Sequence, residues 1–295
     1  MLRSRNPDWP FCLCWANEDW TRSRDGRRGE VLMGQAYSPE DDRRHLQALL
    51  PAFDDPRYLR VDGKPLFLVY RAGRLPDPRG TTESWREEAR RAGAGELHLC
   101  RVESFPDERG DPRALGFDAA VEFQPDWRLL TRGLRARSIP RWPGALAAPR
   151  HRVFDYALVV DRMLAKPVPA YPWARCVIPG WDNSPRRPRG AVVLAGSTPE
   201  GYGRWLSAVL AQARGPDPLV FLNAWNEWGE GCHLEPDLRH GRAYLEATRD
   251  ALAAAVSLPP AGPGAGAPSV TRLEPEARRS RSGDTGPPTG PDAPA

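Results

Sequence analysis

Short runs of almost uniformly apolar residues alternate along this chain with longer segments in which apolar residues recur at three- or four-residue intervals. A strand covered on both faces is apolar at every position, whereas a strand with one face in water alternates between apolar and polar residues. The short runs are therefore predicted to be strands of a parallel sheet buried between two layers. The predicted strands cover residues 11–15, 65–70, 96–102, 119–123, 176–181 and 219–225.

Two pairs of residues mark the starts of predicted helices. Ser38 followed by Pro39, and Thr198 followed by Pro199, place a capping hydroxyl directly before a proline in the first turn. Each pair precedes apolar residues at helical spacing, and a third helical pattern covers residues 242–255. Repeated alternation of strand and helix predicts a parallel sheet wrapped by helices, either a barrel or a doubly wound sheet.

Polar and aromatic residues collect where the predicted strands end, whereas neither of the glycine-rich nucleotide-binding motifs occurs. Functional groups at the carboxyl ends of many strands are typical of the active site of a (β/α) barrel. The sequence shows only six such strands, although a closed barrel of this type has eight. These strand-end positions provide candidate substrate-binding residues, among them Tyr70, Glu103 and Glu122.

The densest group of such residues lies at 223–237, directly after the last predicted strand. Glu227 and Glu230 are three residues apart, so on a helical turn their side chains share one face. Cleavage of a glycosidic bond needs one carboxylic acid and one carboxylate, and the neighbouring Trp225 and Trp228 could desolvate a carboxyl and stack on a sugar. The segment therefore predicts a catalytic carboxylate pair, with a solvated acidic loop as the alternative. Asn226, Trp228 and His233 are predicted to bind substrate beside this pair.

Two further clusters, at 15–22 and 180–187, combine acids, amides and tryptophans in the same way. Such residues suit hydrogen bonding to sugar hydroxyls and stacking on sugar rings. A capped helix start at Asn17 or Asp19 is the alternative for the first cluster, and an Asx turn before a proline is the alternative for the second. The candidate substrate-binding residues of these clusters are Trp15, Asn17, Glu18, Trp20, Trp181, Asp182, Asn183 and Arg186.

Charge and composition exclude several other classes of protein. The chain carries 42 basic and 38 acidic residues, and its basic run at 128–152 contains only one aromatic residue, Trp142, so no nucleic-acid partner is expected. No apolar stretch is long enough to span a membrane, and no secretory signal is found. Five scattered cysteines suggest neither a disulfide framework nor a zinc site. We therefore expect a cytoplasmic protein with reduced thiols, no metal, no cofactor and a glycan or polysaccharide substrate.

Five segments resemble the WbsX-type family, which is named for glycosyltransferases of cell-surface polysaccharide loci and belongs with the glycoside hydrolase family 99-like domains. They are PFCLCWANEDWTR, VDGKPLFLVYR, GWDNSPR, GSTPEGYGRWL and LNAWNEWGEGCHLEPD. The resemblance runs from about Pro10 to Leu252. It implies a (β/α)8 barrel with the metal-independent chemistry of endo-α-mannosidases.

The resemblance also implies roles for individual residues. Glu227 would be the base that deprotonates the mannose 2-hydroxyl, which then acts as the internal nucleophile. Glu230 would be the acid/base that acts on the leaving oxygen and then on water. Sugar-site roles are implied for Trp15, Asn17, Glu18, Trp181, Asp182, Asn183 and Asn226.

One departure from the family concerns the start of the chain. Family members begin with two further strand–helix units, so we expect a barrel domain over residues 1–256 that contains only strands 3–8. Truncation of the reading frame is the favoured interpretation, since open sheet edges leave few stable alternatives; another chain filling the gap is the second. Residues 257–295 are rich in proline and glycine and are predicted to be a disordered tail.

The expected function is that of a carbohydrate-active enzyme with hydrolase chemistry on a cell-surface polysaccharide. A glycosyltransferase of O-antigen or capsule biosynthesis is the alternative enzyme. A glycan-binding or inactive truncated protein is the alternative from another class.

Overall fold

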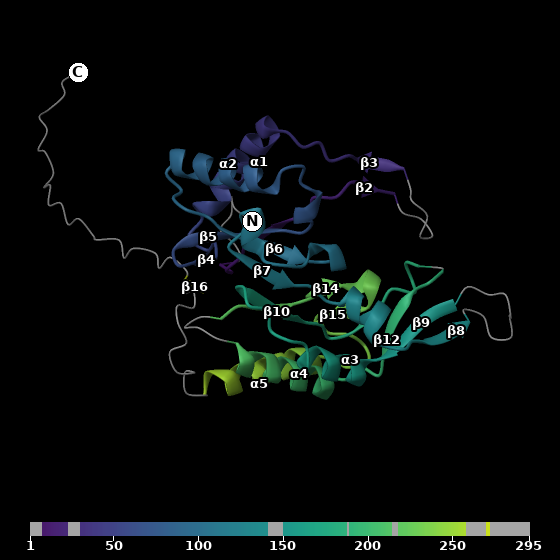
Figure 1. The fold of residues 1–295 in the computed structure, drawn as a ribbon. Helices are drawn as coiled ribbons and strands as arrows, with labels where there is room; N and C mark the ends of the chain where they lie inside the picture. Colours follow the sequence, from purple (N-terminus) through teal and green to yellow (C-terminus); the bar gives the residue numbers. More distant parts are fainter. Residues whose placement is uncertain are drawn as a thin grey trace, which may run out of the picture.

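Six parallel strands form most of the eight-stranded main sheet of the computed structural model, which describes residues 8–22, 30–140, 150–187, 189–213, 218–257 and 270–271 (Figure 1). The strands lie side by side in chain order, and every neighbouring pair is parallel. They form a curled half-barrel with helices on its outside, as the sequence predicted. The strands are β1 (Leu13–Trp15), β5 (Lys64–Val69), β6 (His98–Glu103), β7 (Ala119–Glu122), β10 (Trp173–Val177) and β13 (Val220–Leu222).

The predicted strands are confirmed in number and order; their boundaries shift by one or two residues in four of them and by more in the other two. The run at 176–181 is divided, because β10 begins earlier and Trp181 belongs to a separate strand, β11 (Trp181–Asp182). The run at 219–225 contains only the short β13, because the chain turns away from the sheet after Leu222. Among the described residues, β1 pairs only with β5 and β13 only with β10, so both edges of the half-barrel are open.

The three predicted helices are confirmed. The Ser38 hydroxyl accepts a hydrogen bond from the backbone N–H of Asp41, and the Thr198 hydroxyl accepts one from that of Gly201. The helices are α1 (Pro39–Phe53), α2 (Pro78–Arg91), α3 (Tyr156–Leu164), α4 (Pro199–Gln212) and α5 (Ala243–Val256). In Figure 1, α1 and α2 lie on one side of the strands, and α3, α4 and α5 lie on the other.

Shorter elements lie around the half-barrel. A four-stranded sheet contains β8 (Arg137–Pro140), β9 (Arg150–Asp155), β11 and β12 (Val192–Ala195). Two-stranded pairs are β2 (Trp20–Thr21) with β3 (Val31–Met33), and β14 (Asn226–Glu227) with β15 (Cys232–His233). Turns of 3-10 or π helix occur at Ala72–Arg74, Pro106–Glu108, Pro112–Leu115, Leu129–Gly133 and Trp228–Glu230.

The expected tail is described at only a few of its positions. Ser257 follows α5 directly. Val270–Thr271, as β16, pairs antiparallel with β4 (Arg60–Val61), which itself pairs with β5. The predicted disorder of the remainder falls on residues outside the described ranges.

Alternate residues of one strand enter two different cores, which explains why the predicted strands lack alternation. In β5, Leu66 and Leu68 pack inside the half-barrel with Cys100, whereas Phe67 and Val69 pack on the helix side. A second outer core lies between the sheet and α3, α4 and α5. The residue types of the short runs therefore follow from burial on both faces.

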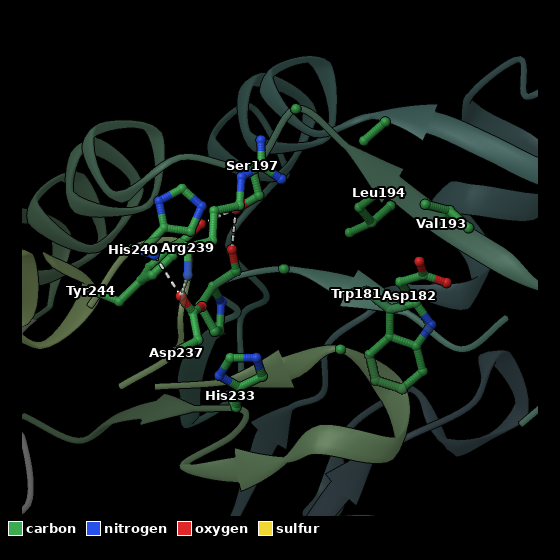
Figure 2. Close-up of a pocket in the computed structure, with 15 residues that line it drawn as sticks. Trp181, Asp182, Val193, Leu194, Ser197, His233, Asp237, Arg239, His240 and Tyr244 are labelled. Atoms are coloured by element: carbon green, nitrogen blue, oxygen red, sulfur yellow. Dashed lines mark hydrogen bonds between the residues drawn. The ribbon is translucent and has the colours of Figure 1, made fainter. Parts of the chain in front are cut away.

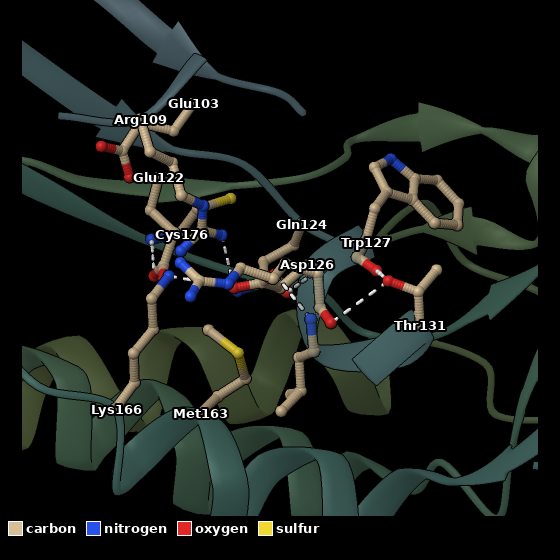
Figure 3. Close-up of polar contacts among 12 residues, drawn as sticks. Glu103, Arg109, Glu122, Gln124, Asp126, Trp127, Thr131, Met163, Lys166 and Cys176 are labelled. Carbon is tan, nitrogen blue, oxygen red and sulfur yellow. Dashed lines mark hydrogen bonds and ion pairs between the residues drawn. The ribbon is translucent and has the colours of Figure 1, made fainter. Parts of the chain in front are cut away.

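A buried polar network interrupts the outer core beside β7 and β10 (Figure 3). Lys166, just after α3, lies with its Nζ atom 2.6 Å from Glu122 Oε1 and 3.0 Å from Asp126 Oδ2. Asp126 also lies 2.7 Å from the Arg109 guanidinium, and Glu122 Oε2 accepts a hydrogen bond from the backbone N–H of Cys176. Both carboxylates are almost fully buried, so their charges depend on these partners.

No helix within the described ranges is long and apolar enough to cross a membrane. In the same ranges, no cluster of three or more His, Cys, Asp or Glu side chains could hold a metal ion.

We expect Lys166→Met to destabilise the fold by about 3 to 5 kcal/mol, because two buried carboxylates lose their shared partner. Lys64→Met is the matched control, since Lys64 is the only other lysine and no ion pair is found for it among the described residues. Urea denaturation followed by circular dichroism measures both free energies of unfolding. Equal stability of the two variants would contradict the assignment of Lys166 as the bridge between the carboxylates.

Candidate active site

A tight hairpin directly after β13 holds the predicted carboxylate pair. Strands β14 and β15 pair antiparallel, with Glu227 opposite Cys232, and the 3-10 turn Trp228–Glu230 connects them. Gly231 closes the turn with a φ of +57°, a conformation that favours glycine. A Cβ atom at Gly231 would lie 3.0 Å from the backbone nitrogen of Asp182, so the hairpin packs closely against β11.

Arg186 joins the two glutamates. One nitrogen of its guanidinium, Nη1, lies 3.3 Å from Glu227 Oε1 and 3.2 Å from Glu230 Oε1. Both carboxylates therefore face the same cation, although Arg186 is more than 40 residues away from them in sequence. The structure thus brings together Glu227, Glu230 and Arg186, three of the residues predicted for the site.

The two glutamates differ in their surroundings. The Glu230 side chain is 26% exposed and that of Glu227 is 45% exposed. Burial raises the pKa of Glu230, and the negative charge of Glu227 raises it further, whereas Arg186 and Arg187 oppose the shift. A carboxyl with a raised pKa keeps its proton to higher pH, which suits Glu230 to donate a proton.

Tryptophans give the hairpin an exposed aromatic surface. The Trp228 ring stacks on the His233 ring with centroids 3.6 Å apart, and its indole N–H donates to Glu235 Oε2 at 2.6 Å. Trp228 and Trp225 are each about half exposed, at 49% and 54%. An indole held on one face and open on the other is suited to stacking on a sugar ring.

Tyr70 lies inside the half-barrel within electrostatic reach of the pair. Burial raises the pKa of Tyr70 to about 12, with smaller contributions from the charges of Glu18 and Glu230. Its ring packs edge-on against Phe123, with centroids 5.5 Å apart. The charge of Glu230 therefore influences the predicted Tyr70, whose ring contact is with Phe123.

The segment 180–187 forms the Asx turn that was one of its two predicted alternatives, and sugar binding by it stays a prediction. Asp182 Oδ1 accepts a hydrogen bond from the Ser184 backbone N–H at 2.9 Å, which is an Asx turn. The same turn places Arg186 at the glutamates. Asn183 is buried and its side-chain oxygen accepts from the Val192 backbone N–H, so Asn183 joins β11 to β12. Trp181 is buried against Trp127.

The first predicted cluster lies mainly in structural contacts. Asn17 is fully buried, donating to the backbone carbonyl of Arg71 and accepting from its N–H, both at 2.8 Å. Glu18 pairs with the Arg71 guanidinium at 2.8 Å. The expected alternative of a helix start is wrong, because the segment continues into β2.

The two tryptophans of that cluster lie apart from each other. Trp15 packs against His45 and Trp85 on the side of α1 and α2, away from the inside of the half-barrel. Trp20 lies on the β2–β3 pair and is 64% exposed.

Glu103 and Glu122 also lie away from the glutamate pair. Glu103 accepts hydrogen bonds from the Tyr171 hydroxyl at 2.6 Å and the Trp173 indole at 3.2 Å. Glu122 belongs to the network around Lys166 described above (Figure 3). Both end their strands on the helix side of the sheet, because strand residues alternate between faces and the adjacent Val102 and Val121 point inward.

A cavity of about 400 Å³ adjoins the hairpin (Figure 2). Six of the residues that line it come from the segments 180–187 and 223–237: Gly180, Trp181, Asp182, Gly231, His233 and Asp237. Asp237, Arg239 and His240 were not among the predicted site residues, although the polar run just before the 242–255 helix was a signal for them. Ser197 and Tyr244, which also line the cavity, were not predicted either.

Comparison with known proteins identifies the family. The model of the family described as "Glycosyltransferase WbsX" matches residues 1–248, so the chain belongs to that family. Two relatives described as "Uncharacterized protein WxcX", from two strains of Xanthomonas campestris pv. campestris, are 44% and 43% identical over 254 residues, or 82% of this chain. The chain spans about a third (34%) of the length of these curated relatives.

Solved structures of similar shape carry glycoside hydrolase descriptions. The endo-alpha-mannosidase of glycoside hydrolase family 99 from Bacteroides thetaiotaomicron has a TM-score of 0.46 and 16% identity, covering 76% of this chain and 66% of its own. A structure described as "Glycoside hydrolase-like protein" has the same TM-score and identity, covering 72% of this chain and 60% of its own.

We expect Arg186→Gln to raise the pKa of Glu230, because a positive charge that favours the carboxylate is removed. Carbon-13 NMR titration of the Glu230 side-chain carboxyl measures this shift. Arg204→Gln, on the far exposed surface of α4, is the control and should leave the titration unchanged. An unchanged or lower pKa in Arg186→Gln would contradict the bridging geometry.

We expect Asn17→Ala to lower the free energy of unfolding by about 1 to 3 kcal/mol, because the buried backbone N–H and C=O of Arg71 lose their partners. Asn226→Ala is the matched control, since Asn226 is exposed and its change should stay within about 0.5 kcal/mol. Chemical denaturation measures both values. A larger loss of unfolding free energy in Asn226→Ala than in Asn17→Ala would contradict the structural role of Asn17.

Proposed function

We propose that this chain contains the catalytic centre of a carbohydrate-active enzyme that cleaves glycosidic bonds of a polysaccharide, with Glu227 and Glu230 as the catalytic pair. The observation that carries the proposal is the pair itself, two carboxylates that face one guanidinium on a hairpin with exposed tryptophans. Membership of a family described by glycosyl transfer supports a glycan substrate. Cleavage needs a carboxyl that holds a proton and a second carboxylate nearby, which the different surroundings of the two residues provide.

The proposed reaction follows endo-α-mannosidase chemistry in two steps. Glu230 donates its proton to the glycosidic oxygen while Glu227 takes the proton of the adjacent 2-hydroxyl. That oxygen attacks the anomeric carbon as the glycosidic bond breaks, and the leaving sugar departs as an alcohol. In the second step Glu230, now a carboxylate, deprotonates water, which opens the intermediate, and the 2-oxygen recovers its proton from Glu227.

Arg186 has an electrostatic role in this proposal. Its charge lowers the energy of both carboxylates when they are ionised, and so limits the rise in the pKa of Glu230 that burial causes. The acid therefore keeps its proton without losing the ability to return to the carboxylate form, which the second step requires.

Glycosyl transfer is the second candidate activity, favoured by the description of the family. It would use the same glutamates with a sugar hydroxyl in place of water. Incubation with sugar nucleotides and oligosaccharide acceptors, followed by mass spectrometry of the products, distinguishes transfer from hydrolysis. A glycan-binding protein without catalysis would show neither product.

We expect Glu230→Gln to lower turnover of α-linked mannooligosaccharides by a factor on the order of 10² to 10⁴, the usual contribution of a general acid. Binding of the same oligosaccharide, measured by calorimetry, should persist because Gln retains the size of Glu. Glu83→Gln on the exposed surface of α2 is the control and should leave turnover unchanged. Full turnover in Glu230→Gln would exclude this residue as the acid.

A further inference from the structure

The cavity in Figure 2 lies beside the glutamate pair and not at it. Its lining includes Gly231, the residue after Glu230, but neither Glu227 nor Glu230. The cavity volume of about 400 Å³ falls in the range of sites for small molecules. The cavity is therefore large enough to be a separate binding site next to the β14–β15 hairpin.

The lining has two chemically different sides. Figure 2 shows the apolar residues Trp181, Val193 and Leu194 on one side, together with Asp182, where β11 and β12 form the wall. The opposite side consists of polar residues from β15, from the turns that precede α4 and α5, and from the first turn of α5. A ligand that fits both sides has an apolar face and a rim of hydrogen-bonding groups. The polar side contains Ser197, His233, Asp237, Arg239, His240 and Tyr244.

The charges around the cavity favour a neutral ligand. Asp237 accepts hydrogen bonds from the backbone N–H groups of Arg239 and His240. Desolvation raises the pKa of Asp237, but the two hydrogen bonds and the nearby imidazoles lower it by more. The net shift is downward, so Asp237 is ionised at neutral pH. Asp182 adds a second carboxylate, and the groups that can balance the two are the Arg239 guanidinium and the imidazoles of His233 and His240. A phosphate or uronate group would therefore meet two negative charges, whereas hydroxyls can donate to the carboxylates and accept from the guanidinium.

His233 connects the cavity to the hairpin. One face of its ring stacks on Trp228, and its Nδ1 atom lies 3.2 Å from the backbone carbonyl of Glu235. The other ring nitrogen has no hydrogen-bond partner among the described residues. A ligand bound to that nitrogen would thus contact the ring that supports Trp228.

We propose that this cavity binds a neutral saccharide unit of the glycan whose scissile bond lies at Glu227 and Glu230. The proposal rests on the proposed function, because it assigns the cavity to part of the same substrate. The C–H face of the sugar packs on the wall formed by β12, where Val193 and Ala195 are only partly buried, and its hydroxyls contact Asp237, Arg239 and His233. Specificity for the sugar next to the cleaved bond then comes from residues that do not take part in the chemistry.

The test uses the full chain carrying Glu230→Gln, so that the sugars are not consumed. Methyl mannoside, methyl glucoside and methyl galactoside are titrated as neutral probes, and glucose 6-phosphate and glucuronate as anionic probes, by saturation-transfer NMR. Two further substitutions, each added to Glu230→Gln, alter the cavity. Arg239→Ala removes a hydrogen-bond donor, and Ala195→Phe fills the space. Their matched controls are Arg242→Ala and Ala254→Phe, exposed positions outside the cavity.

We expect a neutral sugar to bind, with affinity reduced at least about tenfold by Arg239→Ala, since a hydrogen bond to a charged group is lost. Ala195→Phe should have a similar effect, and both controls should bind normally. The proposal is overturned if no neutral sugar binds, if an anionic probe binds more tightly, or if Ala195→Phe leaves binding intact. If the wild-type chain binds the neutral sugar but does not turn over oligosaccharides, the proposed function is contradicted while the saccharide site is supported.

Discussion

Burial of both faces of the parallel sheet is the constraint on which the rest of this structure depends. Leu66 and Leu68 of β5 point into the half-barrel while Phe67 and Val69 point toward the helices. Polar groups therefore lie either at the strand ends or, where they are buried, in hydrogen bonds or ion pairs with other buried groups. Glu122 shows the second case, since its carboxylate is buried on the helix side and lies between Lys166 and the backbone of Cys176. The candidate site shows the first case.

The site itself depends on balanced electrostatics at a tight turn. Glu227 and Glu230 are held close together by the β14–β15 hairpin, where two negative charges would repel each other. Arg186 offsets that repulsion from a different loop. Burial of Glu230 acts in the opposite direction and raises its pKa. The proposed acid function is the result of these opposing effects.

The hairpin also has a physical connection to the neighbouring cavity. Trp228 stacks on His233, and His233 lines the cavity. Close packing of Gly231 on the backbone of Asp182 leaves no room for a side chain between the hairpin and β11. The position of the glutamates and the shape of the cavity therefore depend on the same few contacts.

The sequence by itself determined the six strands, their order, three helices and the position of the glutamate pair. These features are local, because uninterrupted apolar runs, Ser-Pro and Thr-Pro helix starts and the i, i+3 spacing of Glu227 and Glu230 all lie within short segments. The pairing of Arg186 with both glutamates was not predictable, since it joins distant segments.

Tertiary structure decided which polar residues face the site. Asn17, Asn183, Glu103 and Glu122 follow strands just as Glu227 and Tyr70 do, yet their side chains bind backbone groups or buried partners. A residue near a strand end can point inward or outward, and a shift of one position reverses its direction. Only the register of the sheet and the course of each loop determine that direction. For the same reason the polar residues of the cavity, which come from β15, the turns before α4 and α5 and the first turn of α5, become neighbours only in the folded protein.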